Sequence, residues 1–129
     1  QGLYPPVQAS SRIYSSQDIE RWHINEMKSL LSRFSGVKFI FDNVKQKYYP
    51  VLRDAITSFR SKNEGKPLVV IDDTPFIDFD ILDYPVNDIE EIFLLKGSDA
   101  AIWGPKASNG IIVIITQRGK STKIEQKEE

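Results

Sequence analysis

The 129-residue sequence contains no cysteine, one histidine and one methionine. Without cysteine the chain has no disulfides and no thiolate metal sites, and His23 has no second histidine with which to form a typical zinc site. No apolar run approaches the ~20 residues that a membrane-spanning helix needs, and the many amphipathic ~10-residue strands of a membrane barrel are missing. We therefore expect no cofactor, no metal and no direct membrane insertion.

The charges are nearly balanced, with a net charge of −1 and 27% charged residues. Together with 40% hydrophobic residues, this composition is typical of one globular domain. Residues 42–66 carry six lysines and arginines against three acidic residues, which is too dilute a basic patch for nucleic-acid binding. We expect no nucleic-acid partner.

The most informative stretch runs from Asp88 to Gly119. Its pattern predicts a strand at 91–96, a short helix over Ser98–Trp103 capped by Ser98 and stopped at Gly104-Pro105, and a strand at 111–116. Ile111–Ile115 is a run of five aliphatic residues, which indicates a strand covered on both faces. The predicted turn positions are Gly97, Gly104, Asn109 and Gly110.

The remaining pattern predicts an α+β fold with a small mixed sheet. Apolar spacing predicts one long helix over Ser16–Phe34, packed on the sheet together with the short helix. Further strands are expected near 37–41, 55–59 and 68–71, while residues 42–50 are expected to form a loop or hairpin excursion. We expect a linker or arm at 1–15, one domain at 16–119 and a disordered charged tail at 120–129. The residues expected to share one core are Trp22, Leu30, Phe34, Ile71, Phe93, Leu95, Ile112 and Ile114.

One family resemblance emerges from the spacing of residues in 94–116. Leu95-Lys96-Gly97-Ser98, Trp103-Gly104 and Asn109-Gly110-Ile111-Ile112 resemble the end of the plug domain of TonB-dependent outer-membrane receptors, in the version found in Bacteroidetes. Pro67–Asp72 resembles the family's valine-isoleucine-aspartate-glycine strand, although Asp73 stands where the family usually has glycine. The resemblance covers roughly Ser16 to Gly119.

The resemblance implies a domain that, in full receptors, lies inside a transmembrane barrel and gates nutrient uptake driven by the TonB system. This sequence shows no barrel strands and no clear TonB box in Gln1–Tyr14, and its charged tail is expected to be a natural C-terminus. We therefore expect a non-catalytic plug-like module on the periplasmic side of the outer membrane. Its expected partner is a protein of the cell envelope, either an outer-membrane barrel or upstream domains of the same chain. The alternatives are a plug excised from a nutrient transporter and a carboxylate-dependent hydrolase.

Acidic residues are concentrated between Pro67 and Leu95, where no lysine or arginine occurs. They are Asp72, Asp73, Asp78, Asp80, Asp83, Asp88, Glu90 and Glu91. Three interpretations are open: a solvated rim around buried Phe76, Phe79 and Leu82, a protein-contact surface, and a calcium site, although the spacing is not that of an EF-hand. No nucleophile–base set is present, so we predict that the domain is not an enzyme. The predicted contact residues are Asp72, Asp73, Phe76, Asp78, Phe79, Asp80 and Tyr84.

Overall fold

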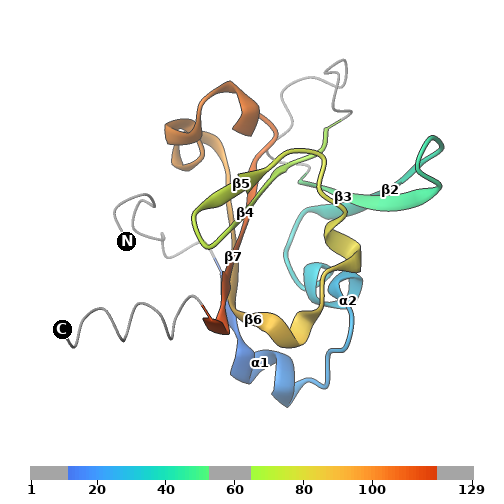
Figure 1. Cartoon of the computed structure of the whole chain (residues 1–129), viewed down its shortest axis with the longest axis vertical. Helices are drawn as coiled ribbons and strands as arrows, with labels where there is room; N and C mark the ends of the chain where they lie inside the picture. Colours follow the sequence, from blue (N-terminus) through green and yellow to red (C-terminus); the bar gives the residue numbers. More distant parts are fainter. Residues whose placement is uncertain (1–11, 53–64, 119–129) are drawn as a thin grey trace.

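The computed structural model describes residues 12–52 and 65–118. They form an α+β domain around a five-stranded mixed sheet with strand order β1-β6-β7-β4-β5 (Figure 1). The predicted fold class is thereby confirmed, whereas the strand expected at 55–59 lies outside the described residues. The sheet strands are β1 (Ile13–Ser15), β4 (Leu68–Ile71), β5 (Thr74–Phe76), β6 (Ile89–Leu95) and β7 (Ile111–Thr116).

Strand β7 lies in the middle of the sheet. It pairs antiparallel with β6 and parallel with β4, and its residues from Ile111 to Ile114 are fully buried. A run of aliphatic side chains fits this position because both faces of a central strand are covered. The turn that leads into β7 needs a left-handed backbone, and Gly110 supplies it with φ of +91°.

The two faces of the sheet carry separate cores, so the prediction of one shared core is wrong. Leu30, Phe34, Ile112 and Ile114 belong to one cluster, with Trp22 and Ile71 packed against it. Phe93 and Leu95 belong to a second cluster on the other face. The division follows from the alternation of side chains along a strand, which sends neighbours such as Leu94 and Leu95 to opposite faces.

The long helix predicted over Ser16–Phe34 is also wrong, because the chain forms two short helices. Helix α1 (Ser16–Arg21) begins with a capping box between Ser15 and Asp18, and α2 (Met27–Leu31) follows. Between them His23 has φ of +56°, and the Ile24 amide donates to the Ile19 carbonyl at 3.0 Å. This is the hydrogen bond of a Schellman motif, which ends α1 with a non-glycine residue in the left-handed position.

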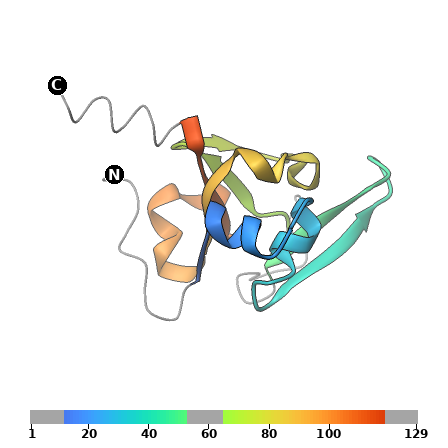
Figure 2. The ribbon, with the colours of Figure 1, turned by 90° about the horizontal axis from the view of Figure 1, so that it is seen from below.

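Residues 37–52 form a hairpin outside the main sheet. Strands β2 (Val37–Asp42) and β3 (Lys47–Leu52) pair antiparallel with each other and make up a separate two-stranded sheet within the described residues. The hairpin projects from the body of the domain, as Figures 1 and 2 show. The prediction that the 37–41 strand joins the main sheet is therefore wrong, whereas the hairpin expected as one option for 42–50 is present.

The short helix predicted over Ser98–Trp103 is replaced by successive 3-10 turns. These are η4 (Gly97–Asp99), η5 (Ala101–Trp103) and η6 (Pro105–Ala107), and Ser98 caps none of them. Gly97 and Gly104 both have positive φ, +57° and +81°, which breaks the segment into single turns. Buried Ala100 and Ala107 bring the segment close to the sheet face that carries the second cluster.

The remaining connections are short and close to the sheet. Strand β5 and the 3-10 turn η2 (Ile81–Asp83) follow β4, and η3 (Val86–Asp88) precedes β6. Strand β1 pairs with β6 and lies in the segment expected to be a linker or arm. In the described part of the chain, no helix has the length and apolar character needed to cross a membrane.

The left-handed conformation of Gly110 leads to a stability prediction. Gly110→Val places a branched side chain at φ of +91°, and we expect a loss of about 1–3 kcal/mol of unfolding free energy in urea denaturation. Ser108→Val is the matched control, because Ser108 is exposed and has φ of −65°. Equal stability of the two variants would contradict a backbone requirement at Gly110.

The packing of α2 leads to a second stability prediction. Leu30 is fully buried in the first core cluster, so Leu30→Ala should lower the unfolding free energy by about 2–5 kcal/mol. Ser29→Ala, at the exposed neighbouring position, should change it by less than about 0.5 kcal/mol. A small loss for Leu30→Ala would show that α2 does not pack on the sheet as described.

Candidate protein-contact site

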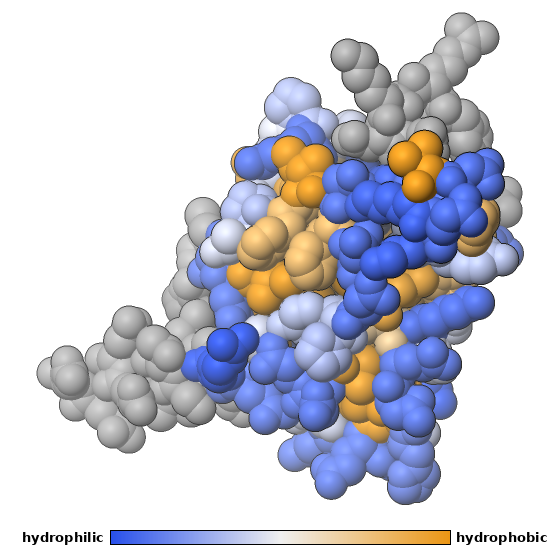
Figure 3. Space-filling view, turned by 45° about the vertical axis from the view of Figure 1, so that its right-hand side comes forward, coloured by the Kyte–Doolittle hydropathy of each residue, from blue (hydrophilic) through white to orange (hydrophobic). Residues whose placement is uncertain are grey.

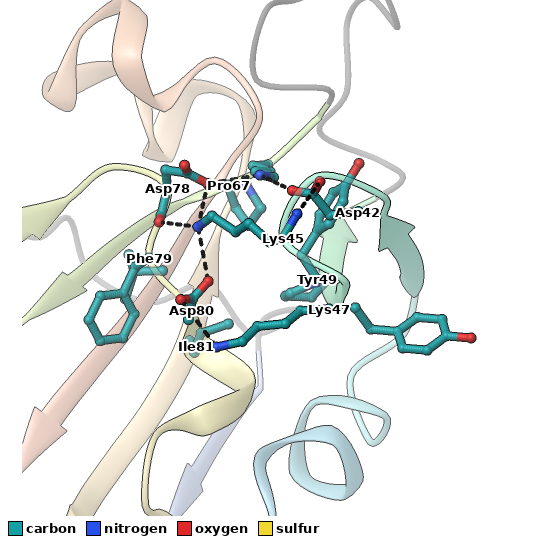
Figure 4. Close-up of a pocket in the computed structure, with 13 residues that line it drawn as sticks. Asp42, Lys45, Lys47, Tyr49, Pro67, Asp78, Phe79, Asp80 and Ile81 are labelled. Carbon is teal, nitrogen blue, oxygen red and sulfur yellow. Dashed lines mark hydrogen bonds and ion pairs between the residues drawn. The ribbon is translucent and has the colours of Figure 1, made fainter.

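A network of ion pairs joins the β2–β3 hairpin to residues 72–91, which carry the concentrated acidic residues and are called the acidic segment (Figure 4). Lys45 Nζ lies 2.9 Å from Asp80 Oδ1 and 3.2 Å from Asp78 Oδ1. Lys47 Nζ lies 2.6 Å from Asp83 Oδ2 and 3.5 Å from Asp80 Oδ2. These pairs connect residues more than 30 positions apart in the sequence. We call the network the ionic clasp; its members are Asp42, Lys45, Lys47, Lys66, Asp78, Asp80 and Asp83.

Lys66 is the least exposed lysine of the ionic clasp. Its Nζ lies 2.9 Å from Asp42 Oδ2 and 2.8 Å from Asp78 Oδ1, and 4.8 Å from the centre of the Tyr49 ring. Burial lowers the pKa of the Lys66 ammonium, but the hydrogen bonds to Asp78 and Asp42 outweigh burial, so the pKa is raised. Lys66 is therefore charged throughout the physiological pH range.

Asp42 fixes the turn of the hairpin while it takes part in the clasp. Its Oδ1 accepts from the backbone amides of Val44 at 2.9 Å and Lys45 at 3.2 Å, as an Asx turn does. The hydrogen bond from Lys66, followed by the one from the Lys45 amide, lowers the pKa of Asp42. Asp42 thus holds the hairpin tip and Lys66 in one arrangement.

A narrow cleft lies beneath the ionic clasp, between the hairpin and the segment that follows β5. The carboxylates and ammoniums cross its mouth, and its free volume is about 20 Å³, enough for about one water molecule. The apolar side chains that line it are Tyr49, Pro50, Pro67, Val69, Phe79 and Ile81. The cleft has no room for a larger group.

A row of aromatic rings continues from the cleft along the acidic segment. Phe79 lies 5.2 Å from Phe76 and 6.2 Å from Tyr84 between ring centres. Phe76 is 37% exposed and the neighbouring Ile77 is 61% exposed. The interpretation in which Phe76 is buried and surrounded by a solvated acidic rim is therefore wrong. Figure 3 shows apolar surface lying among hydrophilic side chains on this side of the molecule.

Asp72 and Asp73 shape the fold rather than the cleft. Both have positive φ, +49° and +73°, and form the turn between β4 and β5, as the tolerance of aspartate for left-handed angles predicts. The Asp72 carboxylate accepts from the Thr116 amide at 2.9 Å and from the Thr116 hydroxyl. This carboxylate therefore ties the end of β4 to the end of β7.

The predicted contact residues thus fall into three groups. Asp78 and Asp80 belong to the ionic clasp, Phe76, Phe79 and Tyr84 form the aromatic row, and the Asp72-Asp73 turn lies at the end of β4. Sequence reasoning missed the lysines that neutralise much of the acidic segment. The excess of basic residues in 42–66 was the available signal, but only the fold shows that Lys45, Lys47 and Lys66 face the carboxylates. No group of three potential metal ligands occurs within residues 12–52 and 65–118.

A family model for the TonB-dependent receptor plug domain matches residues 6–111. The chain belongs to this family. The match includes the hairpin, the acidic segment and most of the stretch after Asp88 on which the resemblance was based.

Solved structures of receptors share the fold. The siderophore receptor PirA from Acinetobacter baumannii matches with a TM-score of 0.64 and 20% identity, over 84% of this chain and 17% of that one. A mutant of the ferric enterobactin receptor PfeA from Pseudomonas aeruginosa, in complex with enterobactin, matches with a TM-score of 0.64 and 18% identity, over 88% of this chain and 18% of that one. The RagAB peptide importer matches with a TM-score of 0.57 and 17% identity, over 86% and 12% of the two chains. The plug-domain chain thus spans less than a fifth of each of these proteins.

The charge state of the ionic clasp predicts how its contribution to stability depends on pH. Hydrogen bonds from lysines lower the pKa values of Asp42, Asp78 and Asp80 below 3.8. The stability that these carboxylates contribute is therefore fully present above pH 3.8 and is lost as the pH falls through the lowered pKa values. The pKa values of the partner lysines are raised above 10.5, so their contribution is present below pH 10.5 and is lost at higher pH.

We therefore expect Lys66→Met to lower the melting temperature by a constant amount between pH 3.8 and 10.5. The difference from wild type should shrink on either side of this window. Lys38→Met, at an exposed position of β2, should differ little from wild type across the range. A difference for Lys66→Met that is independent of pH below 3.8 would show that Lys66 acts through packing alone.

Proposed function

We propose that this domain is a non-catalytic module of the TonB-dependent outer-membrane system that works by contact with another protein. The family membership supports a role in transport, because plug domains are components of transport receptors. The observation that carries the proposal is the aromatic row with exposed Ile77 beside the ionic clasp. Aromatic anchors bordered by charged residues are typical of protein interfaces.

The edge of the sheet favours contact through side chains over pairing of strands. Strand β5 is an edge strand of only three residues, and Pro75 lies at its centre. A short edge strand that contains proline is a poor template for an added strand, since proline offers no amide donor. Phe76, Ile77 and Phe79 therefore provide the contact, and the edge itself does not.

The proposed partner is a protein on the periplasmic side of the outer membrane. It is either the barrel of a receptor or another domain of the same polypeptide, and the Bacteroidetes-type residue pattern of 95–112 supports a placement in that branch of the family. A gate in a nutrient transporter is the second candidate, because the similar solved structures include a siderophore receptor, a ferric enterobactin receptor and a peptide importer. In both cases the domain acts through the surface formed by the aromatic row and Ile77.

Hydrolysis by a carboxylate has less support. The Asp72 carboxylate, which the hydrolase hypothesis would use with Asp73, is engaged by both the amide and the hydroxyl of Thr116. A general base needs a carboxylate that can reach the proton of a substrate or water. Turnover of a glycan or peptide that disappears with Asp72→Asn would overturn the non-catalytic role.

These 129 residues contain no cysteine, so a thiol introduced at one position is the single thiol of this domain and can map the contact. Ile77→Cys and Ile102→Cys are a matched pair, because both side chains are 61% exposed and they lie on different segments. With a thiol-linked photocrosslinker, in the natural full-length polypeptide in cell envelopes, we expect position 77 to crosslink to one defined protein region and position 102 not to reach that region. Mass spectrometry identifies the adducts and distinguishes a barrel from a domain of the same chain.

A second pair of variants measures the strength of the contact. Ile77→Asp should reduce recovery of the crosslinked or co-purified region by about tenfold, as the loss of one buried apolar side chain would. Ile102→Asp should leave recovery unchanged. Equal effects of the two substitutions, or the same adducts from both cysteines, would contradict a contact through the aromatic row.

A further inference from the structure

A surface hollow lies where the turn between α1 and α2 meets the end of α2. Its free volume is about 440 Å³, and Arg33 lines it together with other residues between positions 22 and 32. The lining contains one arginine and no aspartate or glutamate, so its charge favours an anion. The other lining residues are Trp22, His23, Ile24, Asn25, Ser29 and Ser32.

Arg33 is held in place at both its backbone and its side chain. The Tyr14 hydroxyl donates to the Arg33 carbonyl at 2.8 Å, and the guanidinium carbon lies over the Trp22 ring, 3.8 Å from its centre. The Trp22 ring in turn packs edge-on against Tyr14, with 5.5 Å between ring centres. A guanidinium stacked on an aromatic ring keeps its N–H donors available, because they lie in its own plane. Arg33 is therefore preorganised to bind a group from outside.

The charge of Arg33 is not balanced by a carboxylate of the described residues. Arg21 lies over the same Trp22 ring at 5.6 Å, but its guanidinium pairs with Asp18 at 3.1 Å. Arg118 likewise pairs with Asp88. Within residues 12–52 and 65–118, Arg33 forms no such ion pair. Its charge and its donors are consequently available to a ligand.

The surroundings of the hollow favour a carboxylate over a phosphate. Glu20 and Glu26 flank the turn in the sequence but do not line the hollow, and the Glu26 carboxylate accepts from the Ser29 hydroxyl at 3.5 Å. Two neighbouring negative charges repel a dianion more strongly than a monoanion. A single arginine also matches one carboxylate, whose two oxygens accept two parallel N–H bonds.

We propose that this hollow binds the carboxylate of an aspartate or glutamate of a partner protein. Arg33 donates to both oxygens, and Asn25 offers further amide donors from the lining. Half-buried Trp22 and Ile24 give an apolar wall for the residue beside the acidic one. That the carboxylate belongs to a protein rests on the proposed function, whereas the preference for a carboxylate rests on the hollow itself.

The test is an NMR titration of the 129-residue chain with a capped leucine-glutamate-leucine tripeptide. The matched control ligand is the capped leucine-glutamine-leucine tripeptide, which has the same shape without the charge. We expect both peptides to shift the Trp22 indole N–H signal and the amide signals of Asn25 and Ser29. The glutamate peptide should bind about two- to fivefold more tightly, and this preference should shrink as salt rises.

Variants of two cations separate a direct contact from a general effect of charge. With Arg33→Met the affinity for the glutamate peptide should fall to that for the glutamine peptide, which should be unchanged. Arg33→Lys, which keeps the charge but not the fork of donors, should retain part of the preference. Lys28→Met removes a cation of α2 that lies over the Tyr48 ring at 5.1 Å and does not line the hollow, so the preference should remain.

Four outcomes would overturn the proposal. They are equal binding of the two peptides, an equal loss of preference with Lys28→Met, weaker binding of both peptides to Arg33→Met, and tighter binding of inorganic phosphate than of the glutamate peptide. Folding of each variant is checked by the amide signals of β6 and β7. The hollow and Ile77 lie on different segments, so this titration succeeds or fails independently of the crosslinks at position 77.

Discussion

Burial of β7 on both faces is the constraint on which the rest of the domain depends. Its aliphatic side chains alternate between the two faces, so each face needs a cover of its own. One face receives α1, α2 and the base of the hairpin, which pack as one cluster. The other receives the 97–107 segment, where Ala100 and Ala107 allow close approach. A strand of alternating polarity would have removed the need for the second cover.

The β2–β3 hairpin is attached by two kinds of interaction with different physical behaviour. At its base Leu52 is buried in the first core cluster, and apolar burial is insensitive to salt. At its tip Lys45 and Lys47 make exposed ion pairs, which contribute little to stability and are weakened by salt. The hairpin is consequently held by apolar packing at one end and by ion pairs at the other, and the cleft lies between these ends.

The sequence was sufficient for features that depend on local pattern. The aliphatic run of β7 and the left-handed turn at Gly110 follow from residue type alone. The break between α1 and α2 could not be predicted from residue type. Ile19, Met27 and Leu30 face one core whether or not the helix is continuous. The ionic clasp was equally hidden, since its partners meet only after distant segments fold together. Charged residues can pair whatever their distance in the sequence. The numbers of lysines and aspartates therefore do not show which of them form ion pairs.

Phe79 links the ionic clasp to the proposed contact surface. Phe79 is one of the residues that line the cleft beneath the ionic clasp, and its ring is the middle member of the aromatic row between Phe76 and Tyr84. A partner that covers Phe76 and Ile77 approaches this ring from the edge of the sheet. The aromatic row and the packing beneath the ionic clasp therefore share one side chain, and a change at Phe79 affects both.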